Sequence, residues 1–166
     1  DFVLDQLQED HSHISNIHSI VWMAQSFKPS MSPLTKIELK LEKLTEIYAP
    51  LEISIRKNLT SNELTYTQLP ADQIPYFSNW IEIDIPDIEV TVDDTYYIVV
   101  RTQSPSGHSY SWYDMYAEEQ DYYPRGEQWF SNDMGATWSK TSSSNFNIDF
   151  TFRTYSYVSY TDLTAS

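Results

Sequence analysis

The stretch LTKIELKLEKL, residues 34–44, decides the fold class because apolar and charged side chains alternate along it. Ile37, Leu39 and Leu41 fall on one face of an extended chain, and charged residues occupy the positions between them. Successive side chains of a β-strand point to opposite faces, whereas an α-helix needs apolar residues three and four positions apart. The stretch therefore predicts a β-strand that buries one face and exposes the other.

The same two-residue period recurs along the chain and predicts an all-β protein. It is clearest in residues 51–57, 79–86 and 146–154, and weaker in residues 2–8, 21–27, 95–102, 108–116 and 127–132. Asp93–Asp94 is predicted to form a turn, and residues 70–76 a short helical turn. About eight to ten short strands without a long helix indicate an antiparallel β-sandwich of jelly-roll type. We expect a single domain over residues 1–166, with a core module at 5–155.

Composition and charge exclude several classes of protein. The chain has no cysteine, so disulfides and cysteine zinc sites are excluded. Its net charge of −14 would repel nucleic-acid phosphates, and no apolar run approaches the ~20 residues of a membrane helix. We expect neither a nucleic-acid partner nor membrane insertion. Six of ten basic residues lie between 28 and 57 and ten acids between 82 and 121, so either two faces simply differ in charge or copies attract one another.

The octet SNDMGATW, residues 131–138, resembles the Asp-box signature of sialidases. The matching positions are Ser131, Asp133, Gly135, Thr137 and Trp138. In sialidase propellers the motif repeats once per blade and lies away from the catalytic centre, and here it occurs once. A propeller needs several blades of ~40–50 residues, which this chain cannot supply. We expect a structural hairpin, with the aspartate capping turn amides and the glycine adopting positive φ.

The aromatic residues crowded between positions 110 and 130 form the main candidate for a glycan site. Sugar rings present apolar C–H faces that stack on aromatic rings, while acids, amides and guanidinium groups bind their hydroxyls. The candidate stacking residues are Trp112, Tyr116, Tyr123 and Trp129, and the candidate polar partners are Asp114 and Arg125. Alternating aromatics on strands are also common in cores, and either face of residues 108–116 could be the buried one.

Calcium is the metal that this chain could hold, because its loops are rich in carboxylates. The candidate ligands are Asp93, Asp94, Glu118 and Asp121, and the alternatives are an ordinary turn and a solvated acidic loop. His11 and His13 would share a face on a strand, but EDHSHISN favours a polar loop. A retaining glycosidase needs two carboxyls about 5–5.5 Å apart, which neighbours in a loop do not establish. We expect no catalytic residues and no required cofactor.

An ordered set of landmarks gives the chain a wider resemblance. The landmarks are MAQSFKPSMSPLTKIELKL at 23–41, LEISIRKNLT at 51–60, WIEIDIPDIEVTVDDTYYIVV at 80–100, DYYPRGEQWFSNDMGATW at 121–138 and FNIDFTFRTY at 146–155. Their order resembles a family of jelly-roll modules in secreted and surface proteins of archaea and bacteria. Asp93–Asp94 departs from the glycine-rich turn that is usual there. The resemblance covers residues 5 to 155 and implies a non-catalytic accessory β-sandwich outside the cell.

These observations support three functional hypotheses. The first is an extracellular structural or adhesive protein that assembles with copies of itself, or with other cell-surface components, into a filament or surface layer. A terminal strand over residues 156–166 could pair with a neighbouring copy by strand addition. The second is a carbohydrate-binding module with a polysaccharide ligand. The third and least favoured is a glycoside hydrolase or lyase.

Overall fold

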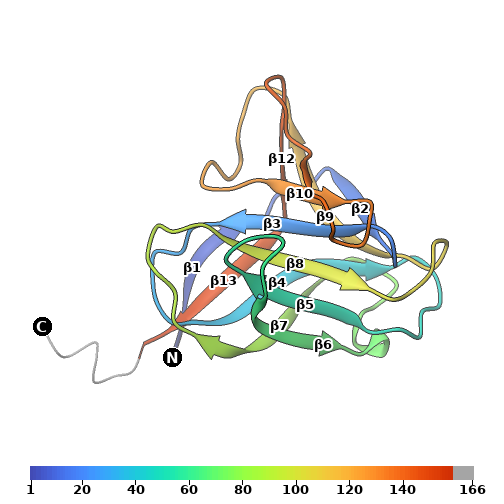
Figure 1. Ribbon diagram of the computed structural model, residues 1–166, viewed down its shortest axis with the longest axis horizontal. Helices are drawn as coiled ribbons and strands as arrows, with labels where there is room; N and C mark the ends of the chain where they lie inside the picture. The colour runs from blue at the N-terminus through green and yellow to red at the C-terminus, as the bar shows by residue number, and fades with distance from the viewer. Residues whose placement is uncertain (159–166) are drawn as a thin grey trace, which may run out of the picture.

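A computed structural model describes residues 1–158 and shows two antiparallel sheets packed face to face (Figure 1). The seven-stranded sheet contains β1 (Phe2–Gln8), β2 (His13–Ile17), β4 (Leu34–Lys43), β7 (Asn79–Ile88), β9 (Tyr110–Ala117), β12 (Asn147–Phe150) and β13 (Phe152–Tyr157). Its order is β1-β13-β4-β9-β12, with β7 paired to β4 and β2 paired to β9. The all-β class and the β-sandwich are confirmed, while the jelly-roll connectivity stays a prediction.

The six-stranded sheet forms the second layer. Its strands, in order across the sheet, are β11 (Ser139–Lys140), β10 (Gln128–Ser131), β3 (Trp22–Phe27), β8 (Tyr96–Thr102), β5 (Leu51–Arg56) and β6 (Glu63–Leu69). A 3-10 helix, η1 (Ala71–Gln73), follows β6 within the predicted helical turn. No helix in residues 1–158 combines the length and the apolar character that spanning a membrane requires.

The core lies between the sheets and is built from the alternating apolar faces of their strands. Ile37, Leu39 and Leu41 of β4 have no exposed surface, and neither do Ile53 and Ile55 of β5 on the opposite sheet. These residues belong to one hydrophobic cluster with Phe150 and Phe152, which are also fully buried. The alternation quoted from residues 34–44 is therefore the alternation between core and surface.

Three strands were not predicted: β2, β6 and the two-residue β11. Residues 13–17 form β2, so the polar-loop expectation is wrong for this segment; only Ile17 of the strand is fully buried. In β6, Thr65 is buried while Leu64 is 47% exposed, which reverses the usual direction of the alternation. β2 and β6 lack a continuous apolar face, and their backbones are held by pairing with β9 and β5 respectively.

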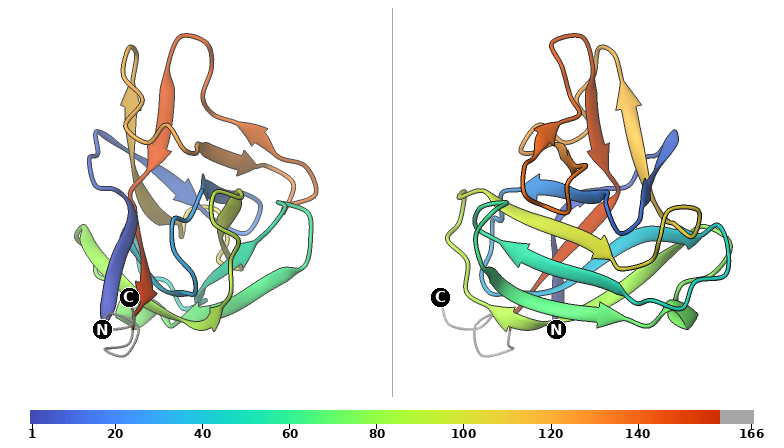
Figure 2. Two further views of the ribbon diagram at one scale, coloured as in Figure 1. Left: turned by 90° about the vertical axis from the view of Figure 1, so that its left-hand side faces the viewer. Right: turned by 45° about the vertical axis from the view of Figure 1, so that its right-hand side comes forward.

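Residues 146–154 were predicted as one strand, but the strand is interrupted at Thr151, between β12 and β13. Before the break, β12 pairs with β9; after it, β13 pairs with β4 and β1. Figure 2 shows β9 and β12 rising side by side above the rest of the sandwich. The apolar alternation continues through the break, so the sequence gives no sign of the change of partner.

The two ends of the described chain lie side by side. β13 is inserted between β1 and β4, and the amino group of Asp1 donates to the carbonyl oxygen of Val158 at 3.0 Å. Of the predicted terminal strand 156–166, residues 156 and 157 belong to β13 and residues 159–166 lie outside the described residues.

Candidate functional site

Two of the four predicted stacking residues lie in the core. Trp112 has no exposed surface, its ring stacks on Phe150 with centroids 3.8 Å apart, and its indole N–H donates to the Thr151 carbonyl at 2.8 Å. Tyr123 is 5% exposed and its hydroxyl donates to Gln6 at 2.7 Å. Neither ring has a face open to a ligand, so both leave the set of stacking candidates.

Asp114 and Tyr116 follow Trp112 on the same face of β9, and neither lines the two hollows described below. Asp114 is 4% exposed and accepts hydrogen bonds from Ser15 at 2.7 Å and Gln128 at 2.8 Å. Burial raises the pKa of the Asp114 carboxyl above its ordinary value. Tyr116 lies further along β9, half exposed, with its ring stacked on Phe146 at 5.1 Å. Both residues lie in the part of β9 that pairs with β12.

The outer face of the six-stranded sheet carries a second apolar cluster. Its buried members are Ala24, Leu59 and Val99, and Trp22, Tyr97, Trp129 and Trp138 pack around them. Leu59 reaches the sheet because the β5–β6 loop lies over β8 (Figure 1). Trp22 borders one hollow on this face, and Tyr97 and Trp129 border another. These two hollows are the candidate functional sites.

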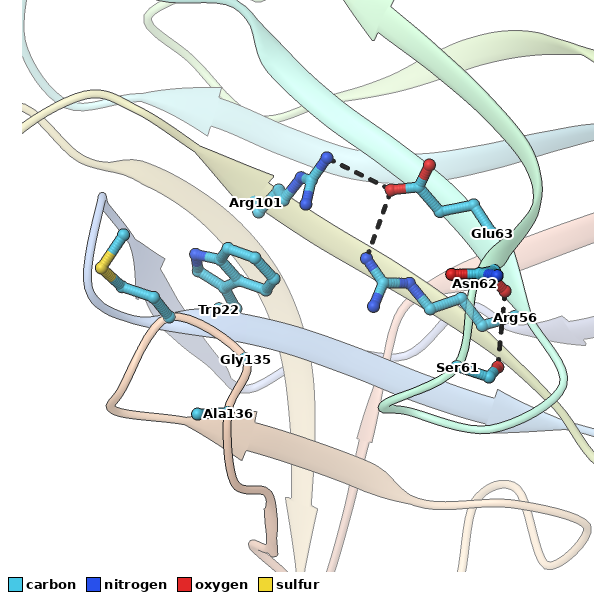
Figure 3. A pocket seen from close by; sticks show the side chains of 9 residues that line it. Trp22, Arg56, Ser61, Asn62, Glu63, Arg101, Gly135 and Ala136 are labelled. Carbon is cyan, nitrogen blue, oxygen red and sulfur yellow. Dashed lines mark hydrogen bonds and ion pairs between the residues drawn. The ribbon is translucent and has the colours of Figure 1, made fainter.

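The first hollow, the Trp22 pocket, has a volume of about 550 Å³. It is lined by Trp22, Arg56, Ser61, Asn62, Glu63, Arg101, Met134, Gly135 and Ala136. Three charged groups converge at its floor: a Glu63 carboxylate oxygen lies 3.2 Å from Arg101 Nη2 and 3.5 Å from Arg56 Nη2 (Figure 3). Burial lowers the pKa of the Arg56 guanidinium. The pocket therefore presents planar donors and acceptors in fixed positions.

The aromatic wall of this pocket is held from two directions. The Arg101 guanidinium carbon lies 5.0 Å from the centre of the Trp22 ring, within the range of a cation–π contact. Gly135 packs directly on the ring, since a Cβ at that position would lie 2.4 Å from the ring carbon Cζ3. Gly135 also has a φ of +83°, so both its backbone and its surroundings require glycine.

The Asp-box residues form the hairpin that places Gly135 there. Asp133 accepts hydrogen bonds from the backbone N–H of Thr137 at 2.9 Å and from the Ser131 hydroxyl at 2.7 Å. The Ser131 hydroxyl oxygen accepts from the Gly135 N–H at 2.8 Å, and the Trp138 indole donates to the Gly135 carbonyl at 3.2 Å. The bonds from Thr137 and Ser131 lower the pKa of Asp133 to about 2. The hairpin thus forms a wall of the Trp22 pocket.

The second hollow, the Trp129 pocket, has a volume of about 470 Å³ and brings together three predicted residues, Asp121, Arg125 and Trp129. Its charged lining consists of Lys28, Arg125 and Lys140 with Asp121 and Glu127. The Tyr97 and Trp129 rings meet edge to face with centroids 6.2 Å apart. The pocket combines aromatic rings with charged groups, as the glycan hypothesis expected of this segment.

The predicted calcium ligands do not meet. Asp93 lies 2.8 Å from Arg125, and Asp94 lies 2.8 Å from Lys57. Within residues 1–158, no group of three or more His, Cys, Asp or Glu side chains could hold a metal ion. The other candidates, Glu118, Asp121, His11 and His13, therefore belong to no such group. Asp93 does adopt the predicted turn, with a φ of +68°.

Comparison with known proteins assigns no family: no family model matches the chain, and no curated protein matches it. The resemblance to extracellular jelly-roll modules is therefore supported only at the level of a two-sheet antiparallel β-sandwich. Function has to be argued from the two pockets and from the surfaces around them.

Of the residues that line the Trp22 pocket, sequence analysis named Gly135 as part of the Asp box and missed Trp22, Arg56, Glu63 and Arg101. The alternation along residues 21–27 and 95–102 does place Trp22 and Arg101 on the face opposite the apolar core positions. In the antiparallel pairing of β3 with β8, Met23 lies opposite Val100, so the next residues, Trp22 and Arg101, also lie opposite each other. A search for aromatic and basic residues at outward positions of adjacent strands would have found this pair.

Proposed function

We propose that this protein is a non-catalytic β-sandwich that binds a carbohydrate in the Trp22 pocket. The observation that carries the proposal is the convergence of Arg56, Arg101 and Glu63 beside the Trp22 ring. Guanidinium and carboxylate groups bind pairs of sugar hydroxyls, and an aromatic wall covers the apolar C–H surface of the ring. The ion pairs hold the polar groups in place before a ligand arrives, which lowers the entropic cost of binding.

Binding is favoured over hydrolysis by the composition of this pocket. Glu63 is the one carboxylate that lines it, and its charge is balanced by two arginines. Glycoside hydrolysis ordinarily uses two carboxyl groups, one of them a proton donor with a raised pKa. A carboxylate between two guanidinium groups is poorly suited to donate a proton. We therefore propose neither a hydrolase nor a lyase.

The proposed setting is the exterior of the cell. The resemblance to modules of secreted and surface proteins supports this location. The proposed ligand is accordingly a cell-surface or environmental polysaccharide. No cofactor enters the proposal.

Replacing Trp22 with alanine is expected to weaken glycan binding at least about tenfold, because the apolar wall and the contact that orients Arg101 are both lost. Arg101→Gln should act in the same direction. A glycan array identifies the ligand, and isothermal titration of the wild type and variants measures the affinity. The matched control is Trp80→Ala, which removes a tryptophan that contacts Arg153 at 3.8 Å on the other sheet. An array without hits, or equal binding by the Trp22 and Trp80 variants, would contradict the proposal.

We also propose a structural role by self-association, favoured by the free edge of β1. This strand pairs only with β13 among the described strands, and it exposes apolar side chains at Phe2 (52%), Leu4 (42%) and Leu7 (40%). An uncovered edge strand with exposed apolar residues is a template for pairing with another chain. Copies that add a strand here would form the filament or surface layer of the first sequence hypothesis.

Placing a lysine on this edge is expected to suppress assembly. Leu4→Lys should raise the concentration at half-assembly about tenfold, because it replaces an exposed apolar contact with a charge that repels the same residue on a neighbouring copy. Light scattering over a concentration series measures the effect. Leu64→Lys is the matched control, since Leu64 is 47% exposed on β6 at the edge of the other sheet. A monodisperse wild-type monomer at millimolar concentration, or equal effects of both variants, would refute assembly through β1.

A further inference from the structure

The Trp129 pocket carries a local excess of positive charge on a strongly acidic protein. The whole chain has a net charge of −14, yet three basic and two acidic residues line this pocket. The Lys140 ammonium lies 3.1 Å from Glu127, and Arg125 lies 2.8 Å from Asp93 outside the pocket. Within residues 1–158, Lys28 has no ion-pair partner. Its ammonium group is the charge available to a ligand.

Asp149, a buried neighbour of Asp121, favours the uncharged form and so adds little negative charge near the pocket. Asp149 is 2% exposed and accepts a hydrogen bond from Gln25 at 3.1 Å. Burial and the neighbouring Asp121 carboxyl raise the pKa of Asp149 to about 8. The raised pKa favours the uncharged form of Asp149 at neutral pH.

Two N–H donors of residues that line the pocket have no acceptor. Arg125 Nε and Trp129 Nε1 are buried and make no hydrogen bond within the described part of the chain. Buried donors without acceptors are costly, so such groups commonly mark a place where a ligand or water supplies the acceptor. Lys28, Arg125 and Trp129 together offer donors to an anionic oxygen.

The aromatic part of the pocket fits a sugar ring better than a simple anion. Tyr97 and Trp129 form an apolar corner, and the Lys140 ammonium lies 5.5 Å from the centre of the Trp129 ring. We infer that the Trp129 pocket is a second glycan site that selects sugars bearing a carboxylate, with Lys28 and Arg125 binding the carboxylate and Trp129 contacting the ring. This inference rests on the proposed carbohydrate-binding function and names the class of ligand for a separate site.

The test compares matched ligand pairs that differ mainly in charge. The pairs are trigalacturonate with its methyl ester, and sialyllactose with lactose, titrated into the wild-type chain at moderate ionic strength. The charged member of at least one pair is expected to bind about tenfold more tightly, because it gains a charge-assisted hydrogen bond that the neutral member lacks. The preference should shrink as salt is added. Equal or weaker binding of the charged member in both pairs overturns the inference.

Variants separate this site from the Trp22 pocket. Lys28→Gln should reduce the preference for the charged ligand, while Lys36→Gln, which removes the same charge from the seven-stranded sheet, should leave it unchanged. Loss of the preference in Trp22→Ala instead of Lys28→Gln would overturn the assignment to the Trp129 pocket. If neutral glycans bind and acidic ones are not preferred, the inference fails while the proposed function stands. If no glycan binds, both fail.

Discussion

Replacing Trp112 with alanine is expected to lower the free energy of unfolding by about 3–5 kcal/mol, a large share of the 5–15 kcal/mol typical of a domain. The indole is fully buried, stacks on Phe150 at 3.8 Å and donates to the Thr151 carbonyl at 2.8 Å. Truncation leaves a cavity between the sheets and an unsatisfied carbonyl at the break between β12 and β13. Urea denaturation followed by circular dichroism measures the loss.

The companion variant Trp112→Phe separates the two contributions. Phenylalanine keeps a ring against Phe150 but loses the N–H donor to Thr151 and part of the buried ring volume, so we expect a smaller cost of about 1–2 kcal/mol. A loss below 1 kcal/mol for Trp112→Ala would mean that the site collapses around the missing ring and that Trp112 does not organise the core. The experiment also tests the reassignment of Trp112 from ligand contact to core.

Stability is expected to fall as the pH rises from about 4 to about 8, and Asp149 is the main cause. Its pKa in the folded chain is raised to about 8, against about 3.9 for an unfolded aspartate. The folded state therefore holds a proton that the unfolded state has lost, and folding is favoured at the acidic end of this window. Burial shifts the pKa of Asp114 in the same direction. Between pH 5 and pH 8 the loss should be about 3 kcal/mol, or roughly 10 °C in melting temperature.

Asp149→Asn is expected to flatten this pH dependence and to stabilise the protein at pH 8. The asparagine carbonyl can accept from Gln25 as the carboxyl does, and its amide can donate toward Asp121 as the protonated acid does. The control is Asp133→Asn: the pKa of Asp133 is lowered to about 2, so its removal should leave the slope between pH 4 and pH 8 unchanged. Thermal melts at pH 5, 6.5 and 8 decide the matter. An unchanged slope in Asp149→Asn would show that Asp149 is not the titrating group.

The sheet layout was predictable where one face of a strand is apolar. Residues 34–44 show this well, because every second position of β4 is buried. It was not predictable where polar side chains point inward, as Thr65 does in β6, or where the chain changes partner without changing its alternation, as at Thr151. In these places pairing with neighbouring strands determines the structure, and pairing is not encoded in local periodicity.

The candidate site was predictable only in part. The segment 121–130 does contribute Asp121, Arg125 and Trp129 to one pocket. The sequence could not decide which face of β9 was buried, since Trp112 and Tyr113 are both aromatic neighbours on opposite faces. The Trp22 pocket is assembled from β3, β5, β6, β8 and the Asp-box hairpin, so its residues are scattered from position 22 to position 136. The spacing of these residues along the chain does not predict that they line one pocket.

The position of β13 constrains how the protein can be made. This strand is the last of the described chain, yet it is an interior strand of the larger sheet, between the edge strand β1 and β4. While a ribosome is still producing the preceding residues, β1 has no neighbour and β4 is missing one of its partners. The larger sheet can close only after translation has passed residue 157, so the nascent chain needs protection from premature association until then.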